Sequence, residues 1–174
     1  MTTLIFPFYV ERTDDMQGVY GRQVARILAE TLQENGVKTK RIQWFAPKND
    51  ARSHVCIEAP LPRNIIDEEA AAHGAERVLL GRVRVAPEET MLKIVEHQPH
   101  GDDEPIPRVK ELGAIHALPH MVERAAQTLL SVYTDGSAHP APADISDTEA
   151  PNAAAHFESW RDALLARDAQ ELTS

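Results

Sequence analysis

The feature that most constrains the fold is the alternation of short apolar runs with longer segments of helical periodicity. Strands are expected at residues 4–10, 37–45, 76–85 and 90–97, and helices at residues 18–35, 64–73 and 115–133. Strands joined by helical crossovers become parallel neighbours, whereas strands joined by a tight turn pair antiparallel. The order strand, helix, strand, helix, strand, strand, helix therefore predicts an α/β fold with a mixed sheet and helices packed on it.

Glycine and proline positions refine this pattern. In the clearest strand, Leu79, Gly81 and Val83 alternate with arginines, so we expect them on its inward face. A larger side chain at Gly81 would then overpack the core. Pro7 removes one ladder hydrogen bond from the first strand, which is expected to be weakest there.

Two long segments carry the apolar faces that core helices need. Val24, Leu28 and Leu32 recur on one face of the first segment, and Asn35-Gly36 supplies a left-handed end. The last helix of the set shows the same periodicity. Both helices are therefore expected to pack on the sheet.

The composition changes after residue 133. Residues 134–151 are rich in Ala, Pro, Ser and Asp, which is typical of a linker. Residues 1–133 are accordingly expected to form the folded α/β domain. Residues 152–174 regain helical periodicity and predict a C-terminal amphipathic helix.

The apolar stripe of this terminal helix is formed by Phe157, Trp160 and Leu164. An isolated helix of about 20 residues is marginal in water, so its order must come from packing. The sequence leaves two alternatives open: the helix docks on its own domain, or it docks on another chain or on following helical repeats. In the second case these three residues are the partner-binding anchors, and a dimer is one form of that association.

The charge balance excludes two classes of partner. The chain has 27 acidic and 18 basic residues and a net charge of −9. Nucleic acids and anionic membrane surfaces attract proteins with a basic excess instead. No apolar run approaches the roughly 18 residues of a membrane-spanning helix. We therefore expect neither nucleic-acid nor membrane binding.

The cysteine content bears on the compartment. The single Cys56 cannot form an internal disulfide, and it excludes zinc modules with four thiolate ligands. A reducing cytoplasm is therefore the expected location. The first residues carry no positive side chain before the first apolar run, so neither a secretory signal nor a transit peptide is expected.

Histidines provide the only candidate metal ligands with a suggestive spacing. His116 and His120 are four residues apart, which can place two imidazoles on one helical face. Pro119 disturbs that turn, and the glutamate of a zinc-protease helix is absent. A further ligand from His97 or His100 would be needed. Surface histidines are the more common interpretation, and a metal site is the alternative.

Motifs that dictate a reaction are absent. Residues 18–21 place two glycines before the first long helix, but they lack the third glycine of a dinucleotide fingerprint and the Gly-Lys-Ser/Thr of a phosphate loop. No Gly-x-Ser-x-Gly nucleophile turn occurs. We therefore predict a protein that is not an enzyme and that has no cofactor.

Several local phrases resemble the TolB N-terminal-like domain, a small α/β module found ahead of tetratricopeptide repeats in bacterial regulatory and scaffold proteins. The matching pieces are Ile-Phe-Pro-Phe at residues 5–8, the helix at 21–32, the helix-turn-strand phrase at 70–83, the hairpin at 83–95 and the helix at 115–130. The resemblance covers residues 3–133. It implies an α/β interaction module.

Residues 152–167 resemble the first helix of a tetratricopeptide-type unit. That resemblance implies either a fragment or relative of a longer regulatory protein, or a chain that uses one helix as a dimer clip. The leading hypothesis is therefore a non-catalytic protein-interaction or scaffold module. The alternative is a small metal-dependent enzyme or ligand-binding domain that uses the four histidines His97, His100, His116 and His120.

Overall fold

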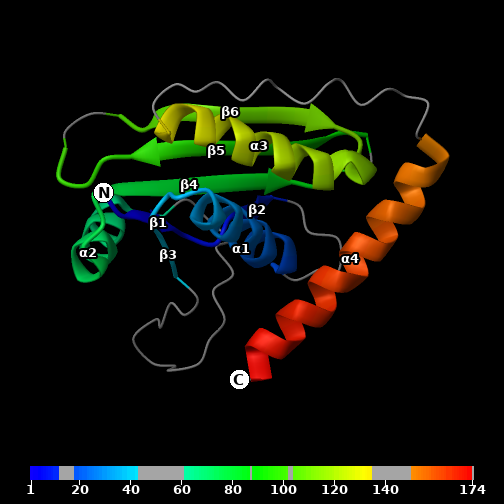
Figure 1. Ribbon diagram of the computed structural model, residues 1–174, viewed down its shortest axis with the longest axis horizontal. Coiled ribbons are helices and arrows are strands. Elements are labelled where there is room, and N and C mark those ends of the chain that lie inside the picture. The colour runs from blue at the N-terminus through cyan, green and yellow to red at the C-terminus, as the bar shows by residue number, and fades with distance from the viewer. Residues whose placement is uncertain (12–17, 43–60, 87, 102–103, 135–149, 174) are drawn as a thin grey trace.

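The computed structural model describes residues 1–11, 18–42, 61–86, 88–101, 104–134 and 150–173 (Figure 1). Within these ranges the strands are β1 (Thr3–Ile5), β2 (Tyr9–Glu11), β3 (Thr39–Arg41), β4 (Arg77–Arg84), β5 (Thr90–His97) and β6 (Ile106–Gly113). The helices are α1 (Val19–Glu34), α2 (Arg63–His73), α3 (Leu118–Tyr133), which follows the 3-10 turn η1 (Ile115–Ala117), and α4 (Ala150–Thr173). The predicted mixed α/β fold is confirmed.

The described strands form one sheet in the order β3-β1-β4-β5-β6, and β2 also pairs with β4. Strand β1 runs parallel to β3 and β4, because helical crossovers connect them. Strands β4, β5 and β6 form an antiparallel meander. The parallel pairs and the antiparallel pair of β4 and β5 thus follow from the connections that the sequence predicts.

The single strand expected at residues 4–10 is two strands in the structure, and the interruption includes Pro7, where the strand was expected to be weakest. Strands β1 and β2 lie on either side of this residue, and both pair with β4. Between them the N–H of Phe8 leaves the sheet and donates to the carbonyl of Gly21 in α1, at 2.9 Å. The break therefore connects the sheet to the first helix.

Strand β6 differs from the prediction. The polar and proline-containing residues before Arg108 read as a loop, and no strand was expected after them. In the structure Ile106 to Gly113 pair with β5, and the register shifts between Ile94 and Val95. This β-bulge changes the phase of the side chains, so the strand lacks the strict alternation that reveals a strand in a sequence.

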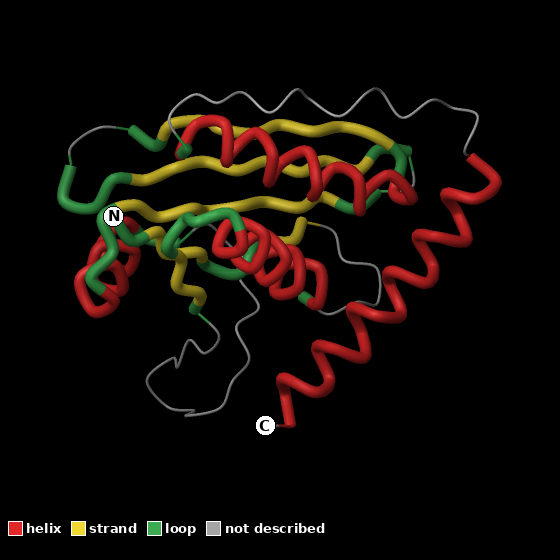
Figure 2. Tube along the Cα trace, viewed as in Figure 1, coloured by secondary structure: helices red, strands yellow, loops and turns green. Residues whose placement is uncertain are grey.

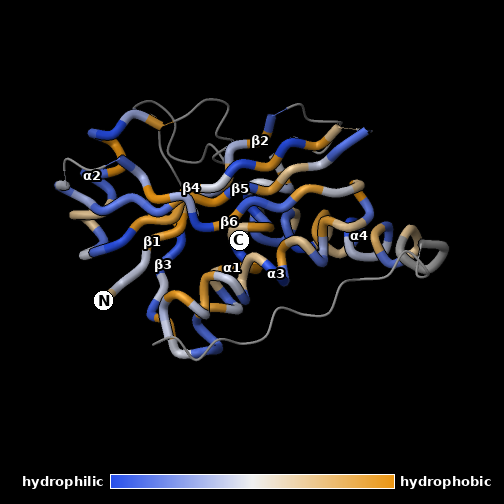
Figure 3. The backbone as a smooth tube through the Cα atoms, turned by 90° about the horizontal axis from the view of Figure 1, so that it is seen from above, coloured by the Kyte–Doolittle hydropathy of each residue, from blue (hydrophilic) through white to orange (hydrophobic). Residues whose placement is uncertain are grey.

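Helices α1 and α3 lie along one face of the sheet (Figures 1 and 2). The larger core cluster lies between them and includes Leu28, Leu92 and Leu129, which are fully buried. A smaller cluster lies on the opposite face, under α2, and includes Phe6 and Ile66. The view in Figure 3 shows α1 and α3 together on one side of the sheet.

Helix α4 packs against α1 and η1, and it contacts α3 less extensively. Asp168 of α4 is buried, and its two carboxylate oxygens accept hydrogen bonds from Arg22 Nε at 2.9 Å and Nη2 at 2.7 Å. The side chain of Gln23 donates to the same carboxylate at 3.0 Å. A polar cluster on α1 therefore holds the C-terminal half of α4.

In the part of the chain that the structure describes, no helix combines the length and the apolar character needed to cross a bilayer. The predicted linker at 134–151 falls almost entirely outside the described residues, as does Cys56.

Candidate binding face of the sheet

Among the described elements, α2 covers one end of the sheet face opposite α1 and α3. Beyond that helix, Leu80 and Val95 are half-buried, and Lys110 and Leu112 are exposed. We call this surface of β4, β5 and β6 the open face. Antiparallel strands can leave one face to solvent, and apolar side chains on such a face make it a candidate binding surface.

A row of basic side chains crosses the open face. Arg82 of β4 pairs in register with Lys93 of β5, and Lys93 pairs with Lys110 of β6. Like charges directly opposite each other on neighbouring strands are destabilising. We call these three residues the basic row.

Within the described ranges, one member of the basic row has an ion pair. Arg82 lies 3.4 Å from a carboxylate oxygen of Glu11, and its guanidinium lies 5.4 Å from the ring centroid of Tyr9. Both partners of that ion pair are partly exposed, so it contributes little. Among the described residues, Lys93 and Lys110 have no salt bridge. Their charges are available to a ligand.

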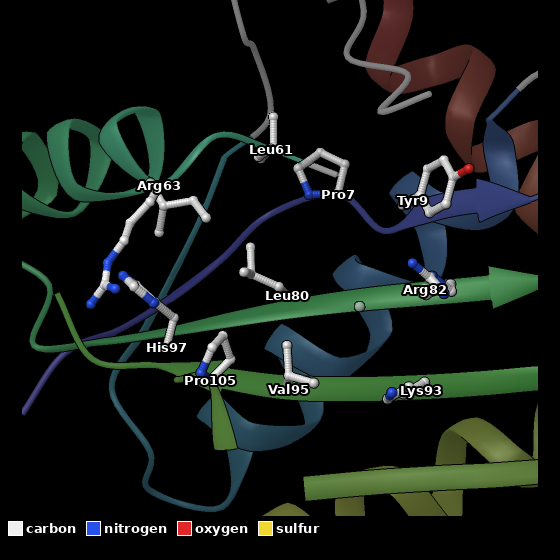
Figure 4. Close-up of a pocket in the computed structure, with 12 residues that line it drawn as sticks. Pro7, Tyr9, Leu61, Arg63, Leu80, Arg82, Lys93, Val95, His97 and Pro105 are labelled. Atoms are coloured by element: carbon white, nitrogen blue, oxygen red, sulfur yellow. The ribbon is translucent and has the colours of Figure 1, made fainter. Parts of the chain in front are cut away.

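A pocket of about 390 Å³ adjoins the basic row (Figure 4). Its described lining residues are Pro7, Tyr9, Leu61, Arg63, Ile66, Leu80, Gly81, Arg82, Lys93, Val95, His97 and Pro105. Figure 4 shows Leu80 and Val95 in the middle, Arg82 and Lys93 at one end, and Arg63 with His97 at the other. No acidic side chain is among these lining residues, so the pocket combines an apolar centre with basic ends.

His97 and His100 meet at Asp67 of α2. The buried His97 ring places Nε2 3.1 Å from an Asp67 carboxylate oxygen, and the backbone N–H of His100 donates to the same oxygen at 3.3 Å. The hydrogen bond from His97 is the main reason why the pKa of Asp67 is lowered from 3.8. These contacts attach α2 to the end of β5.

His116 and His120 lie at the opposite end of the sheet. They follow Gly113, which pairs with Thr90 at the start of β5, whereas His97 is the last residue of that strand. Seven residues of strand separate the two ends by roughly 23 Å. The structure therefore does not bring the four histidines together. The described residues contain no group of three or more potential metal ligands arranged around one point.

The predicted partner-binding residues lie on α4. Phe157 and Leu164 are 5% and 2% exposed and belong to the larger core cluster, whereas Trp160 is half-buried. The rings of Phe157 and Trp160 have centroids 6.1 Å apart. The structure thus shows the stripe packed on its own domain. Binding of another chain by these residues stays a prediction.

Sequence reasoning did not identify the basic row or the pocket. It placed Arg82 on the outward face of its strand, which is correct, but the position of Lys110 depends on β6. Without that strand the register that aligns Lys93 with Lys110 cannot be derived. The sequence signal that could have indicated a basic surface was the presence of Arg82 and Lys93 in two neighbouring strands of a chain with a net charge of −9.

Comparison with known proteins gives only distant similarities. No family model and no curated protein matches the chain. Among solved structures, a PelC dodecamer from Paraburkholderia phytofirmans aligns over 74% of this chain and 84% of that chain, with a TM-score of 0.45 and 11% identity. TolB from Acinetobacter baumannii aligns over 76% and 28%, with a TM-score of 0.43 and 14% identity.

The C-terminal domain of LpoB from Salmonella enterica is also similar, over 64% of this chain and 80% of that chain, with a TM-score of 0.31 and 13% identity. A TolB structure is thus among the neighbours, as the sequence resemblance leads one to expect. All three similarities are too distant to carry an argument about function, so the proposal below relies on this chain's own residues.

Proposed function

We propose that the protein is a non-catalytic interaction module that binds an acidic segment of a partner protein on its open face. The basic row is the observation that carries this proposal. Its three like charges lie side by side on a half-exposed surface, and carboxylates from a partner would relieve their repulsion.

The basic row contrasts with the overall acidic charge of the chain. With a net charge of −9, most of the protein surface repels an acidic partner, whereas the open face attracts one.

A charge reversal on the open face tests the proposal. The probe is a fluorescein-labelled hexaglutamate peptide, and binding is measured by fluorescence anisotropy at low salt. We expect Lys93→Glu to weaken binding by about tenfold, which corresponds to ~1.4 kcal/mol. The matched control is Lys38→Glu, which makes the same charge change at an exposed position outside this face.

Two results would contradict the proposal. The first is no binding of hexaglutamate by the unaltered protein. The second is an equal loss of affinity in Lys93→Glu and Lys38→Glu, because that would show a general effect of net charge. Higher salt should weaken binding to the unaltered protein, since exposed charges are screened over about 10 Å at 0.1 M.

The stripe of α4 is a second candidate contact for another protein or a second copy of the chain. The observation that favours it is the incomplete burial of two large side chains of this helix: Trp160 is half-buried, and Leu165 is 40% exposed. Light scattering on Trp160→Ala tests this second proposal, because loss of a contact between copies lowers the apparent mass.

A further inference from the structure

The open face has a period of two residues along its strands. Arg82 and Lys93 form one cross-strand pair, and Leu80 and Val95 form the pair two residues further along. Side chains on one face of a strand recur every second residue, about 6.6 Å apart. A basic zone therefore lies one such step from an apolar zone.

The shape of the pocket limits what can enter it. Its floor consists of the two neighbouring strands β4 and β5, whose axes are about 4.8 Å apart. Pro7 and Leu61 lie on one side of this floor and Pro105 on the other (Figure 4). A helix with its side chains is about 10–12 Å across, whereas a single extended chain is much narrower. The floor matches an extended segment.

We propose that the pocket binds an extended segment of the acidic partner in which an apolar residue lies two positions from an aspartate or glutamate. The carboxylate contacts Arg82 and Lys93, and the apolar side chain packs on Leu80 and Val95. This inference rests on the proposed function, and it adds the pattern by which the partner is recognised.

The spacing of two follows from the extended conformation of the ligand. Residues i and i+2 of an extended chain face the same side, whereas neighbouring residues face opposite sides. An acidic and an apolar residue two positions apart therefore reach the basic and apolar zones together. A peptide of identical composition with adjacent acidic and apolar residues cannot do so.

Two labelled peptides test the pattern. Both are flanked by Gly-Ser, and their central sequences are Glu-Ser-Leu-Ser-Glu and Glu-Leu-Ser-Ser-Glu. The first peptide is symmetric, so its leucine lies two positions from a glutamate in either chain direction. The second peptide has the same composition, but its leucine is next to a glutamate and therefore faces the opposite side of the extended chain. We expect the first peptide to bind about tenfold more tightly in fluorescence anisotropy.

A pair of protein variants assigns this preference to the pocket. Val95→Gln replaces an apolar lining residue that is already half-exposed, and Leu112→Gln makes the same kind of change on the open face outside the pocket. We expect Val95→Gln to abolish the preference between the peptides and Leu112→Gln to retain it. Circular dichroism of both variants verifies that they are folded, and Leu80→Asn serves in place of Val95→Gln if that variant is not.

The outcomes separate this inference from the proposed function. If both peptides bind equally and Lys93→Glu weakens both, the pattern is wrong and the proposed function stands. If neither peptide nor hexaglutamate binds, both proposals fail.

If an alanine-based helical peptide with Glu and Leu four residues apart binds more tightly than the extended peptide, the partner is helical and the inference is overturned. Binding of dodecanoate without binding of either peptide also overturns it, in favour of a small amphiphilic anion.

Discussion

The aromatic ring of Phe8 lies directly against Gly81, where any β-carbon at position 81 would meet the ring. Phe8 is almost fully buried. The backbone carbonyl of Phe8 also lies against Gly21 of α1. The missing side chains of Gly21 and Gly81 thus leave room for the carbonyl and the ring of Phe8, respectively. Phe8 therefore fills the space between β4 and α1 that two absent side chains leave.

Substitution of Gly81 should destabilise the fold. We expect Gly81→Val to lower the free energy of unfolding by about 1–3 kcal/mol, because the added methyl groups overpack against Phe8. Urea unfolding measures this difference. Arg84→Val is the matched control, since it places the same side chain at an exposed position of the same strand. In the double variant with Phe8→Leu, part of the loss at Gly81 should be recovered, and a melting temperature unchanged by Gly81→Val would contradict the packing described.

The hydroxyl of Tyr133 donates a hydrogen bond to buried Glu96, at 2.5 Å. Burial first, and then this hydrogen bond, raises the pKa of Tyr133 above 10.0. In the unfolded chain the phenol ionises near pH 10, whereas in the folded protein it stays neutral to higher pH. The stabilisation is therefore complete below pH 10 and decreases as the pH rises above that value.

Alkaline unfolding measures this dependence. We expect the stability of the unaltered protein to decline above about pH 10, with tyrosinate absorbance from Tyr133 appearing only as the protein unfolds. Tyr133→Phe should be less stable near neutrality by about 1.5–3 kcal/mol, because it removes a hydrogen bond to a charged group. Its stability should decline less above pH 10. An equally steep decline in Tyr133→Phe would show that another group is responsible.

The buried carboxylate of Asp168 should be essential for the position of α4. We expect Asp168→Asn to destabilise this attachment by about 3 kcal/mol, since it removes the carboxylate that accepts both hydrogen bonds from Arg22 and one of the two carboxylates that accept from Gln23. Thermal unfolding and limited proteolysis near the C-terminus measure the effect. Asp162→Asn, on the exposed side of α4, should change neither. Equal behaviour of the two variants would argue against the polar cluster on α1.

Trp160→Ala distinguishes the two roles of the α4 stripe. Because Phe157 and Leu164 are buried on the chain's own domain, loss of the half-buried Trp160 ring should lower the melting temperature, and packing within the chain alone leaves the apparent mass in light scattering unchanged. A fall in apparent mass would instead assign Trp160 to a contact between copies. A variant unchanged in both measurements would remove this side chain from either role.

The sequence predicted those features that depend on the residues of a single helix or strand. The apolar face of α1, the break at Pro7 and the inward position of Gly81 all depend on nearby residues, and the structure agrees with them. Strand β6 was missed because its bulge interrupts the alternation of side chains.

The histidine hypothesis shows why the rest could not be derived. His100 and His116 are close in the sequence, but β6 carries the chain back along the length of β5 between them. Elements that are neighbours in the sequence are thus placed at opposite ends of the sheet. In the basic row, by contrast, residues that are far apart in the sequence become neighbours. Its three members come from three strands, and the register that aligns them is defined only by the fold.

The contact between Arg22 and Asp168 joins positions 146 residues apart in the chain. Closing so long a loop is entropically unfavourable, and a lone helix of this length is marginal in water. Helix α4 is therefore expected to be stable only when it is packed on α1. We therefore expect the surface of α1 that carries Arg22 and Gln23 to form before α4 docks on it. Docking of α4 should thus be a separate, salt-sensitive step that follows the folding of α1.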